Sequence, residues 1–493
     1  MTSATRGIDA FRSLRRQLED SVLPLATSLD GRRFALQAPV RELPVRLGGY
    51  VGLGAGDDAR LGQVTGLRIE DVDGPEVDLP LADGGGLART GVTFRLARGE
   101  GVVLAGAGPF VDAALAPAEP ADVADWLQGV APRGGRLAAG ELPLAGGVPF
   151  ALDASAFRRH TFLCGQSGSG KTYATGLLLE QLLLETNLRI VVLDPNSDYA
   201  RMGALRPDAD PEAAARYAAL AARIDVRSGD GLRLRLGELE PAAQAALLRL
   251  DPVGDREEYA ELAAIVDAER PVDLDALAAS PAPGARALRL RAENLGIGDL
   301  GVWARDRGGS VIAALAGGEA RMLVVGLGSL SSREEQAIVA AGVLAELWRR
   351  RAERRPTLVV VDEAHNVCPG VAEDPLVARA TRDAIAIAAE GRKFGLHLLV
   401  CTQRPQKIHE NVLTQCENLV LMRLNAAADV AFAQDAFSFV PRELLGLAAS
   451  FRQGEALVAG RIASHAAIIR FGARVAQEGG ADVPATWARG APR

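Results

Sequence analysis

After about residue 160, predominantly apolar runs recur along the chain, and most of them are followed by a polar residue. They cover residues 162–164, 188–193, 322–325, 357–361 and 396–401. Short runs without polar alternation are typical of parallel strands whose two faces are both covered by helices. Longer stretches with helical periodicity separate them, among them residues 171–185 and 332–351. The pattern predicts an α/β domain built on a parallel sheet.

Two other regions show different patterns. Between about residues 32 and 108, short apolar runs are separated by glycines and Asp-Gly turns, which predicts a small β-barrel. An irregular glycine-rich lobe is the alternative. From about residue 205 to 315 the chain is rich in Ala, Leu, Arg and Glu, and proline-containing breaks separate helical patterns. We interpret this region as a helical insertion or lid.

Composition narrows the class of protein. The 493 residues are 48% hydrophobic, which is enough for a large core, and they carry a net charge of −7. The four cysteines form no C-x-x-C pair and the histidines lack metal-binding spacing, so neither a disulfide framework nor a zinc site is indicated. With no signal peptide and no apolar run that could span a bilayer, we expect a cytoplasmic protein without a membrane partner. If such an acidic chain binds nucleic acid, it must use a local basic surface.

The first apolar run leads into Gly165–Thr172, which reads GQSGSGKT and fits the P-loop pattern G-x-x-x-x-G-K-[ST]. The glycines let backbone N–H groups surround a phosphate, and the start of the next helix favours the same negative charge. Lys171 would reach the β- and γ-phosphates of ATP, and Thr172 would bind Mg²⁺. Because the chain has only two other lysines, Lys393 and Lys407, a chance match in a glycine-rich turn is the weaker alternative. The predicted ATP-binding residues are Gly165, Gln166, Ser167, Gly168, Ser169, Gly170, Lys171, Thr172 and Tyr173.

Two acids follow the run at residues 357–361. Asp362 and Glu363 would emerge at the C-terminal edge of the sheet, where ligands bind in α/β folds. Asp362 is a candidate Mg²⁺ ligand, and Glu363 is a candidate base that orients or deprotonates the attacking water. Gln403, which follows the run at 396–401, is a candidate for sensing the γ-phosphate through that water. An ordinary strand end that carries Asp-Glu is the alternative.

Taken as a set, the motifs resemble the HerA family of hexameric ATPases, which is related to the FtsK DNA pumps and the conjugative-transfer ATPases. They are GQSGSGKT, DPNSDY at 194–199, VVVDEAHN at 359–366, EGRKFG at 390–395, TQRP at 402–405, NVLTQCENLVLMRLN at 411–425 and GEALVAGR at 454–461. The resemblance covers about residues 32–471. DPNSDY departs from the usual DPHGEY, so the details of that loop are not transferred.

The resemblance implies a RecA-like P-loop core with a small N-terminal β-barrel and a helical insertion. It also implies assembly as a ring, with six identical subunits and ATP sites between them, and an arginine finger from the neighbouring subunit. Arg392 is the first candidate for this finger, followed by Arg159 and Arg423, and each is alternatively a surface or strand-end cation. The predicted divisions are residues 1–30 (helical segment), 31–110 (barrel), 111–150 (connection), 151–204 with 316–475 (ATPase domain), 205–315 (insertion) and 476–493 (polar tail).

Three functions fit these expectations. The first is a Mg²⁺-dependent ATPase ring that translocates double-stranded DNA and works with a nuclease in end processing or in defence against foreign DNA. The second is an ATP-gated scaffold that presents an effector protein without moving DNA. The third is a conjugation or secretion ATPase at a membrane, which the absence of an anchor disfavours. Stimulation of ATP hydrolysis by double-stranded DNA discriminates the first from the second.

Overall fold

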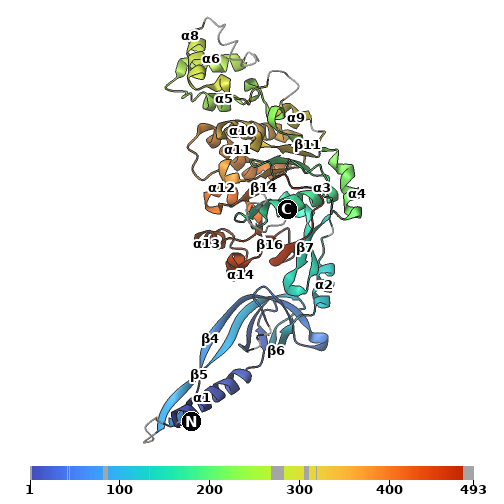
Figure 1. Ribbon diagram of the computed structural model, residues 1–493, viewed down its shortest axis with the longest axis vertical. Helices are drawn as coiled ribbons and strands as arrows, with labels where there is room; N and C mark the ends of the chain where they lie inside the picture. Colours follow the sequence, from blue (N-terminus) through green and yellow to red (C-terminus); the bar gives the residue numbers. More distant parts are fainter. Residues whose placement is uncertain are drawn as a thin grey trace, which may run out of the picture.

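The computed structural model describes residues 3–41, 43, 45–80, 87–132, 134–267, 282–304, 310–317 and 319–480. The molecule is elongated, with a β-barrel at one end, a large α/β domain in the middle and a group of helices at the other end (Figure 1). The predicted α/β class is confirmed, because one mixed sheet of 11 strands organises the central domain. The predicted tail lies mostly outside the described residues, which end at residue 480.

The central sheet has the strand order β11-β12-β10-β13-β14-β9-β15-β16-β17-β7-β8. The first seven run parallel: β11 (Ile224–Arg227), β12 (Met322–Val325), β10 (Arg189–Leu193), β13 (Thr357–Val361), β14 (Leu396–Thr402), β9 (His160–Cys164) and β15 (Cys416–Leu421). An antiparallel extension follows: β16 (Glu455–Gly460), β17 (Ala467–Phe471), β7 (Arg136–Leu142) and β8 (Val148–Asp153).

Helices cover both faces of the parallel strands, as the continuous apolar runs predict. In β10, Val191 and Leu193 belong to the core on the side of α10 (Arg333–Arg349) and α11 (Pro375–Glu390). Ile190 and Val192 face the opposite core, with α3 (Lys171–Glu185). Every residue of β10 is buried, because alternate side chains point into two different cores. The sheet therefore gives a rigid edge on which loops at the strand ends can be placed.

The N-terminal barrel has the strand order β1-β2-β5-β4-β3-β6. Its strands are β1 (Leu25–Ser28), β2 (Arg33–Pro39), β3 (Tyr50–Leu53), β4 (Arg60–Pro80), β5 (Leu87–Ala105) and β6 (Phe110–Pro117). Phe34, Leu36, Leu53 and Val64 lie in its core. The β4–β5 hairpin is longer than the barrel needs, and helix α1 (Ser3–Asp20) lies along its projecting part (Figure 1).

Several domain boundaries differ from the expected ones. The barrel extends to β1 and β6, beyond residues 31–110, because both strands are needed to close it. Strands β7 and β8, expected in a connection at 111–150, pair with β17 and belong to the central sheet. Strand β11 lies within the expected insertion at 205–315 but adds a parallel edge to that sheet. The pairings that place these strands, β1 with β6, β7 with β17 and β11 with β12, join segments distant in sequence, so local pattern did not reveal them.

Helices form most of the remaining structure. The insertion contains α4 (Pro211–Ala221), α5 (Pro241–Leu247), α6 (Arg256–Asp267), α8 (Pro283–Asn294) and α9 (Val311–Gly317). Outside it lie α2 (Pro120–Gly129), α12 (Glu410–Leu413), α13 (Ala427–Ala436) and α14 (Arg442–Gly446). Helix α10 begins with the predicted cap, since Ser332 accepts from the Glu335 N–H and the Glu335 side chain reaches back to Ser332. Within the described ranges, no helix is both long and apolar enough to cross a bilayer.

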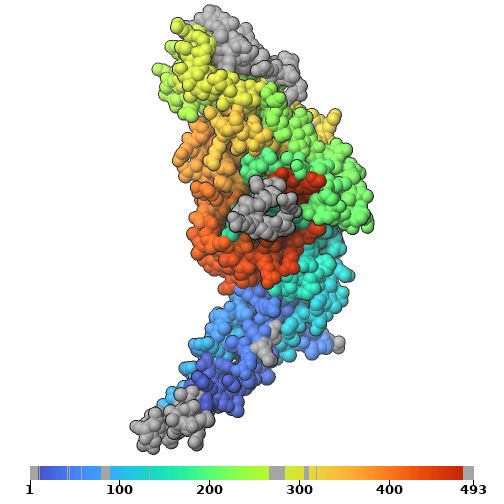
Figure 2. Space-filling model, in the orientation of Figure 1, coloured from blue at the N-terminus to red at the C-terminus, as the bar shows by residue number. Residues whose placement is uncertain are grey.

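Residues 472–480, which we call the C-terminal strap, lie on the central domain (dark red in Figure 2) and contact residues of helix α3. Arg474 is fully buried and its Nε donates to Glu180 Oε1 at 2.8 Å. The same carboxylate accepts the N–H groups of Val475 and Ala476. A Cβ at Gly176 would lie 2.3 Å from the Arg474 guanidinium carbon, so glycine is needed there. The strap is therefore held by an ion pair inside the core.

We expect Arg474→Ala to destabilise the central domain by about 3–5 kcal/mol, because it leaves the buried Glu180 carboxylate without its counter-charge. The thermal unfolding transition measures this loss. Arg442→Ala is the matched control, since the Arg442–Asp435 pair is exposed at 61% and 72% and contributes less than about 1 kcal/mol. Equal shifts for the two variants would contradict the structural role of the strap.

Candidate nucleotide-binding site

The loop at residues 165–170 connects β9 to α3 at the C-terminal edge of the sheet. Gly168 and Gly170 have φ values of 73° and 95°, in the left-handed region that favours glycine. The loop is supported by the segment after β15, where the Arg423 carbonyl accepts the Gln166 N–H at 2.9 Å. Arg423 Nη2 in turn donates to the Gly168 carbonyl at 3.1 Å. The backbone thus has the open, glycine-dependent geometry expected of a phosphate-binding loop.

Lys171 lies against the two predicted acids. Its Nζ is 2.6 Å from Asp362 Oδ1 and 3.2 Å from Glu363 Oε1, and the residue is only 6% exposed. Strands β9 and β13 are separated by β14 alone, which brings residues 191 positions apart into contact. Burial by itself would lower the pKa of Lys171, but the attraction of Asp362 and Glu363 outweighs it and raises the pKa. The ammonium therefore stays charged at neutral pH.

Glu363 and Gln403 are also joined. Gln403 Nε2 donates to Glu363 Oε1 at 2.6 Å. Glu363 has a φ of 43°, unusual for a residue with a side chain, and such strain is concentrated at functional sites. His365 Nδ1 lies 3.3 Å from Glu363 Oε2 and 3.2 Å from Thr402 Oγ1. Burial lowers the pKa of His365, so this neighbour is a neutral hydrogen-bonding group at physiological pH.

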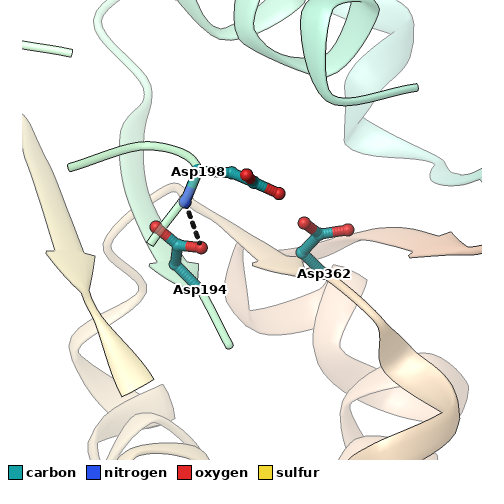
Figure 3. A group of neighbouring side chains, drawn as sticks. All are labelled: Asp194, Asp198 and Asp362. Carbon is teal, nitrogen blue, oxygen red and sulfur yellow. Dashed lines mark hydrogen bonds between the residues drawn. The ribbon is translucent and has the colours of Figure 1, made fainter. Parts of the chain in front are cut away.

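Three aspartates meet beside Lys171. Oxygens of Asp194, Asp198 and Asp362 lie within 4.8 Å of one another, with Asp194 at the end of β10 and Asp362 at the end of β13 (Figure 3). Asp194 accepts the N–H groups of Asp198 and Tyr199 at 2.9 Å each, which shapes the loop. Thr172 Oγ1 is 3.3 Å from Asp198 Oδ2. Both predicted Mg²⁺ ligands, Thr172 and Asp362, therefore lie near Asp198.

This group of side chains fits a divalent cation. Asp362 Oδ2 and Glu363 Oε2 are buried and have no hydrogen-bond partner in the described structure. The Lys171 ammonium contacts two of the carboxylates, those of Asp362 and Glu363, and the carboxyl groups of Asp194 and Asp198 lie close to that of Asp362. Hard oxygen ligands with surplus negative charge are what Mg²⁺ prefers. The residues at this edge could thus hold Mg²⁺ beside a nucleotide.

The sequence reasoning did not include Asp194, Asp198 or His365 among the site residues. The signal for the aspartates was present, because a buried strand ends at Asp194 and Asp198 follows in the DPNSDY motif. His365 had no comparable signal, since its contact with Glu363 depends on the short turn after β13. Tyr173, a predicted binding residue, has its hydroxyl on the strap, where it accepts the Arg474 N–H at 2.9 Å. Its side chain is thus engaged away from the loop.

The three candidate arginines occupy two different places. Arg423 follows β15 and contacts its own P-loop at Gly168, so the structure does not favour it as a residue donated to a neighbour. Arg159 precedes β9 and Arg392 precedes β14, which places both at the edge of the sheet opposite the P-loop. There they share the carboxylate of Glu417.

Comparison with known proteins finds relatives over part of the chain. The family model described as "Helicase HerA, central domain" matches residues 137–273. The "DNA double-strand break repair helicase HerA" of Pyrococcus furiosus is 33% identical over 115 residues, covering 23% of this chain and 20% of that protein. The protein with the same name from Sulfurisphaera tokodaii is 29% identical over 153 residues, covering 29% of this chain and 30% of that protein. The matched regions thus span less than a third of these relatives.

Among solved structures, VirB4 of Thermoanaerobacter pseudethanolicus is similar with a TM-score of 0.49 and 14% identity, covering 69% of this chain and 97% of that one. The fold and the site of this chain define a P-loop ATPase. A phosphate-binding loop leads into Lys171, and this lysine contacts two acids that follow a strand. Within that class, residues 137–273 match the model of the HerA central domain, and the chain is similar to HerA helicases over 23% to 29% of its length.

The pKa of Asp194 is raised from 3.8 to about 7, chiefly by burial, although two backbone N–H groups oppose the shift. Between these two values the folded protein holds a proton that the unfolded chain has released, so stability falls as pH rises through the window. We expect Asp194→Asn to flatten that part of the pH dependence of thermal unfolding. Added Mg²⁺ should stabilise the wild type more above this window than below it, because the ligand is then ionised. Equal pH slopes for variant and wild type would contradict the assignment.

Proposed function

We propose that this chain is a Mg²⁺-dependent ATPase that assembles as a ring and translocates double-stranded DNA. One observation carries the ATPase proposal. Lys171, Asp362, Glu363 and Gln403 come from three strand ends far apart in sequence, yet form one contiguous hydrogen-bonded group beside the P-loop. A strand-end glutamate joined to a polar residue of the next strand is what hydrolysis requires beyond nucleotide binding.

Each residue has a defined part in this proposal. The N–H groups of the loop bind the phosphates. When ATP binds, Lys171 leaves Asp362 and Glu363 and contacts the β- and γ-phosphates instead. That exchange frees Glu363 to accept the proton of the attacking water, which Gln403 orients. Mg²⁺, held by Thr172 and Asp362 with Asp198 nearby, would neutralise charge on the phosphate oxygens.

Assembly of several copies is part of the proposal because two of the candidate finger arginines, Arg159 and Arg392, lie at the edge of the sheet opposite the P-loop. Strand β9 has 5 residues, and at about 3.3 Å per residue it separates Arg159 from the P-loop by about 17 Å. An arginine side chain cannot cover that distance. Arg159 and Arg392 can therefore reach a γ-phosphate only in a second copy, as a ring with sites between subunits provides.

The proposed substrate rests on the relatives that the chain resembles. They are named DNA double-strand break repair helicases, which supports double-stranded DNA as the polymer that is moved and the processing of broken ends as the process. Action beside a nuclease is a further part of the proposal. Because the net charge is −7, DNA contacts must come from a local basic surface, for which a ring pore is the natural place. A scaffold that does not move DNA, or a conjugation ATPase, would be the outcome if DNA had no effect.

We expect Glu363→Gln to keep ATP binding and to lower kcat by at least about 100-fold, because the base is lost while the phosphate contacts remain. Lys171→Ala should lose binding itself, since the ammonium contacts the phosphates directly. A fluorescent ATP analogue measures affinity, and phosphate release measures turnover. Hydrolysis by Lys171→Ala at the wild-type rate would overturn the ATPase proposal.

We expect double-stranded DNA to stimulate hydrolysis, and the stimulation to fall steeply with salt as phosphate contacts are screened. Single-stranded DNA and a neutral polymer serve as comparisons, and light scattering measures particle mass in parallel. A ring of constant mass whose hydrolysis does not respond to any DNA would favour the scaffold instead.

A further inference from the structure

Three arginines surround one carboxylate at the sheet edge opposite the P-loop, and we call them the arginine cluster (Arg159, Arg392 and Arg461). Arg159 Nη1 donates to Glu417 Oε1 at 2.8 Å, and Arg392 Nη1 donates to the same oxygen at 2.6 Å. Arg461 Nε lies 4.0 Å from Glu417 Oε2. The three cations come from three separate segments: the start of β9, the turn before β14 and the loop after β16. A single acid therefore holds together cations that would otherwise repel each other.

The backbone at Glu417 is shaped for this contact. The pairing of β15 with β9 shifts register between Cys416 and Asn418, so Glu417 is the extra residue of a bulge. Bulges of this kind redirect a side chain away from the regular strand positions. The neighbouring strand approaches closely, because a Cβ at Gly460 (φ 94°) would lie 2.1 Å from the Glu417 carbonyl oxygen.

Asn418, the residue after Glu417, connects this bulge to the backbone around Arg159. Its side chain is fully buried, and Nδ2 donates to the carbonyl of Ala156 at 3.1 Å and to that of Arg159 at 3.4 Å. Nδ2 also lies 3.1 Å from Thr161 Oγ1. The backbone on both sides of Arg159 is thus fixed relative to Glu417.

The cluster itself is accessible. The side chains of Arg159, Arg392 and Glu417 are 34%, 36% and 37% exposed. Three guanidinium groups face one carboxylate, so the cluster keeps a net positive charge. Ion pairs this exposed contribute little to folding stability. A surface ion pair does not need a bulge, a buried asparagine and an obligatory glycine to form. Their presence points to a requirement for a defined position of the arginine side chains.

We propose that Glu417 is a positioning residue that presents Arg159 and Arg392 as a pair to the γ-phosphate of ATP bound in a second copy of this chain. This inference rests on the proposed ATPase function. Each of these long side chains would lose rotamer freedom when it binds a phosphate. A shared carboxylate orders both side chains before the phosphate is bound, so less conformational entropy is lost on binding. A terminal phosphate carries more charge than one carboxylate, so it competes successfully for the exposed donors of both arginines.

Glu417→Gln tests the proposal, with Glu417→Asp as the conservative variant and Asp435→Asn, at an exposed pair with Arg442, as the control. We expect Glu417→Gln to lower kcat by about 10- to 100-fold, the range that misplacement by about 1 Å produces, while ATP affinity stays unchanged. Glu417→Asp should recover part of the loss, and Asp435→Asn should behave as wild type. In a protein that already carries Arg159→Ala and Arg392→Ala, Glu417→Gln should have no further effect. A full additional loss there would overturn the positioning role.

Co-expressed mixed rings show on which site Glu417 acts. A Glu417→Gln subunit has an intact P-loop, and a Lys171→Ala subunit has an intact arginine cluster. Where the arginine cluster of a Lys171→Ala subunit faces the P-loop of a Glu417→Gln subunit, a complete site forms. The mixed ring should therefore hydrolyse ATP faster than a ring of either variant alone. No recovery in the mixture, or wild-type kcat in Glu417→Gln alone, overturns the inference and leaves the ATPase proposal standing. Unimpaired hydrolysis by Lys171→Ala would instead overturn the ATPase proposal itself.

Discussion

The contact between the Lys171 ammonium and the acid pair Asp362–Glu363 is the interaction on which the site depends. Without nucleotide it neutralises part of a buried group of carboxylates that would otherwise repel each other. Because these charged groups are buried, breaking the contact without replacing it costs free energy. Only a ligand with comparable negative charge can therefore take the place of the acids beside Lys171. A triphosphate with its cation meets that condition, since it supplies negative charge to Lys171 and positive charge to the acids.

Close backbone approach is the second constraint, and it operates at some distance from the chemistry. Gly176 leaves room for the Arg474 guanidinium, which fixes the C-terminal strap to α3. Further along the strap, the Gly479 N–H donates to the Asp198 carbonyl at 2.9 Å, beside the acidic cluster. The end of the described chain therefore supports the loop that carries Asp194 and Asp198. This connects the stability of the core with the geometry of the site.

The two edges of the parallel sheet carry different groups of side chains. Its C-terminal edge gathers the P-loop, the acids and Gln403, whereas its opposite edge carries the arginine cluster around Glu417. A rigid sheet separates the two groups by a strand length. Under the proposed function, the arginine cluster therefore acts on the site of a second copy, and hydrolysis depends on the contact between neighbouring subunits.

Local pattern determined much of this protein. Continuous apolar runs specified buried parallel strands, and the glycines with Lys171 specified the phosphate loop, because each is a short-range property of consecutive residues. The positions of Asp362, Glu363 and Gln403 at strand ends were sufficient to place them on one edge. The membership of β7 and β11 in the central sheet escaped detection because it depends on the partners β17 and β12, which are far along the chain.

Only the tertiary structure decided which charges meet. It brought Asp198 to Thr172, His365 to Glu363, and Arg159 with Arg392 to Glu417, and it placed Arg423 on its own loop. Apart from the His365–Glu363 contact, which forms within one turn, these contacts join segments whose strands have a different order in the sheet than in the sequence. The sequence by itself determined the kind of phosphate site, through residue types at fixed intervals. Strand order determined its full set of ligands, because electrostatic interactions depend on distance in space and not along the chain.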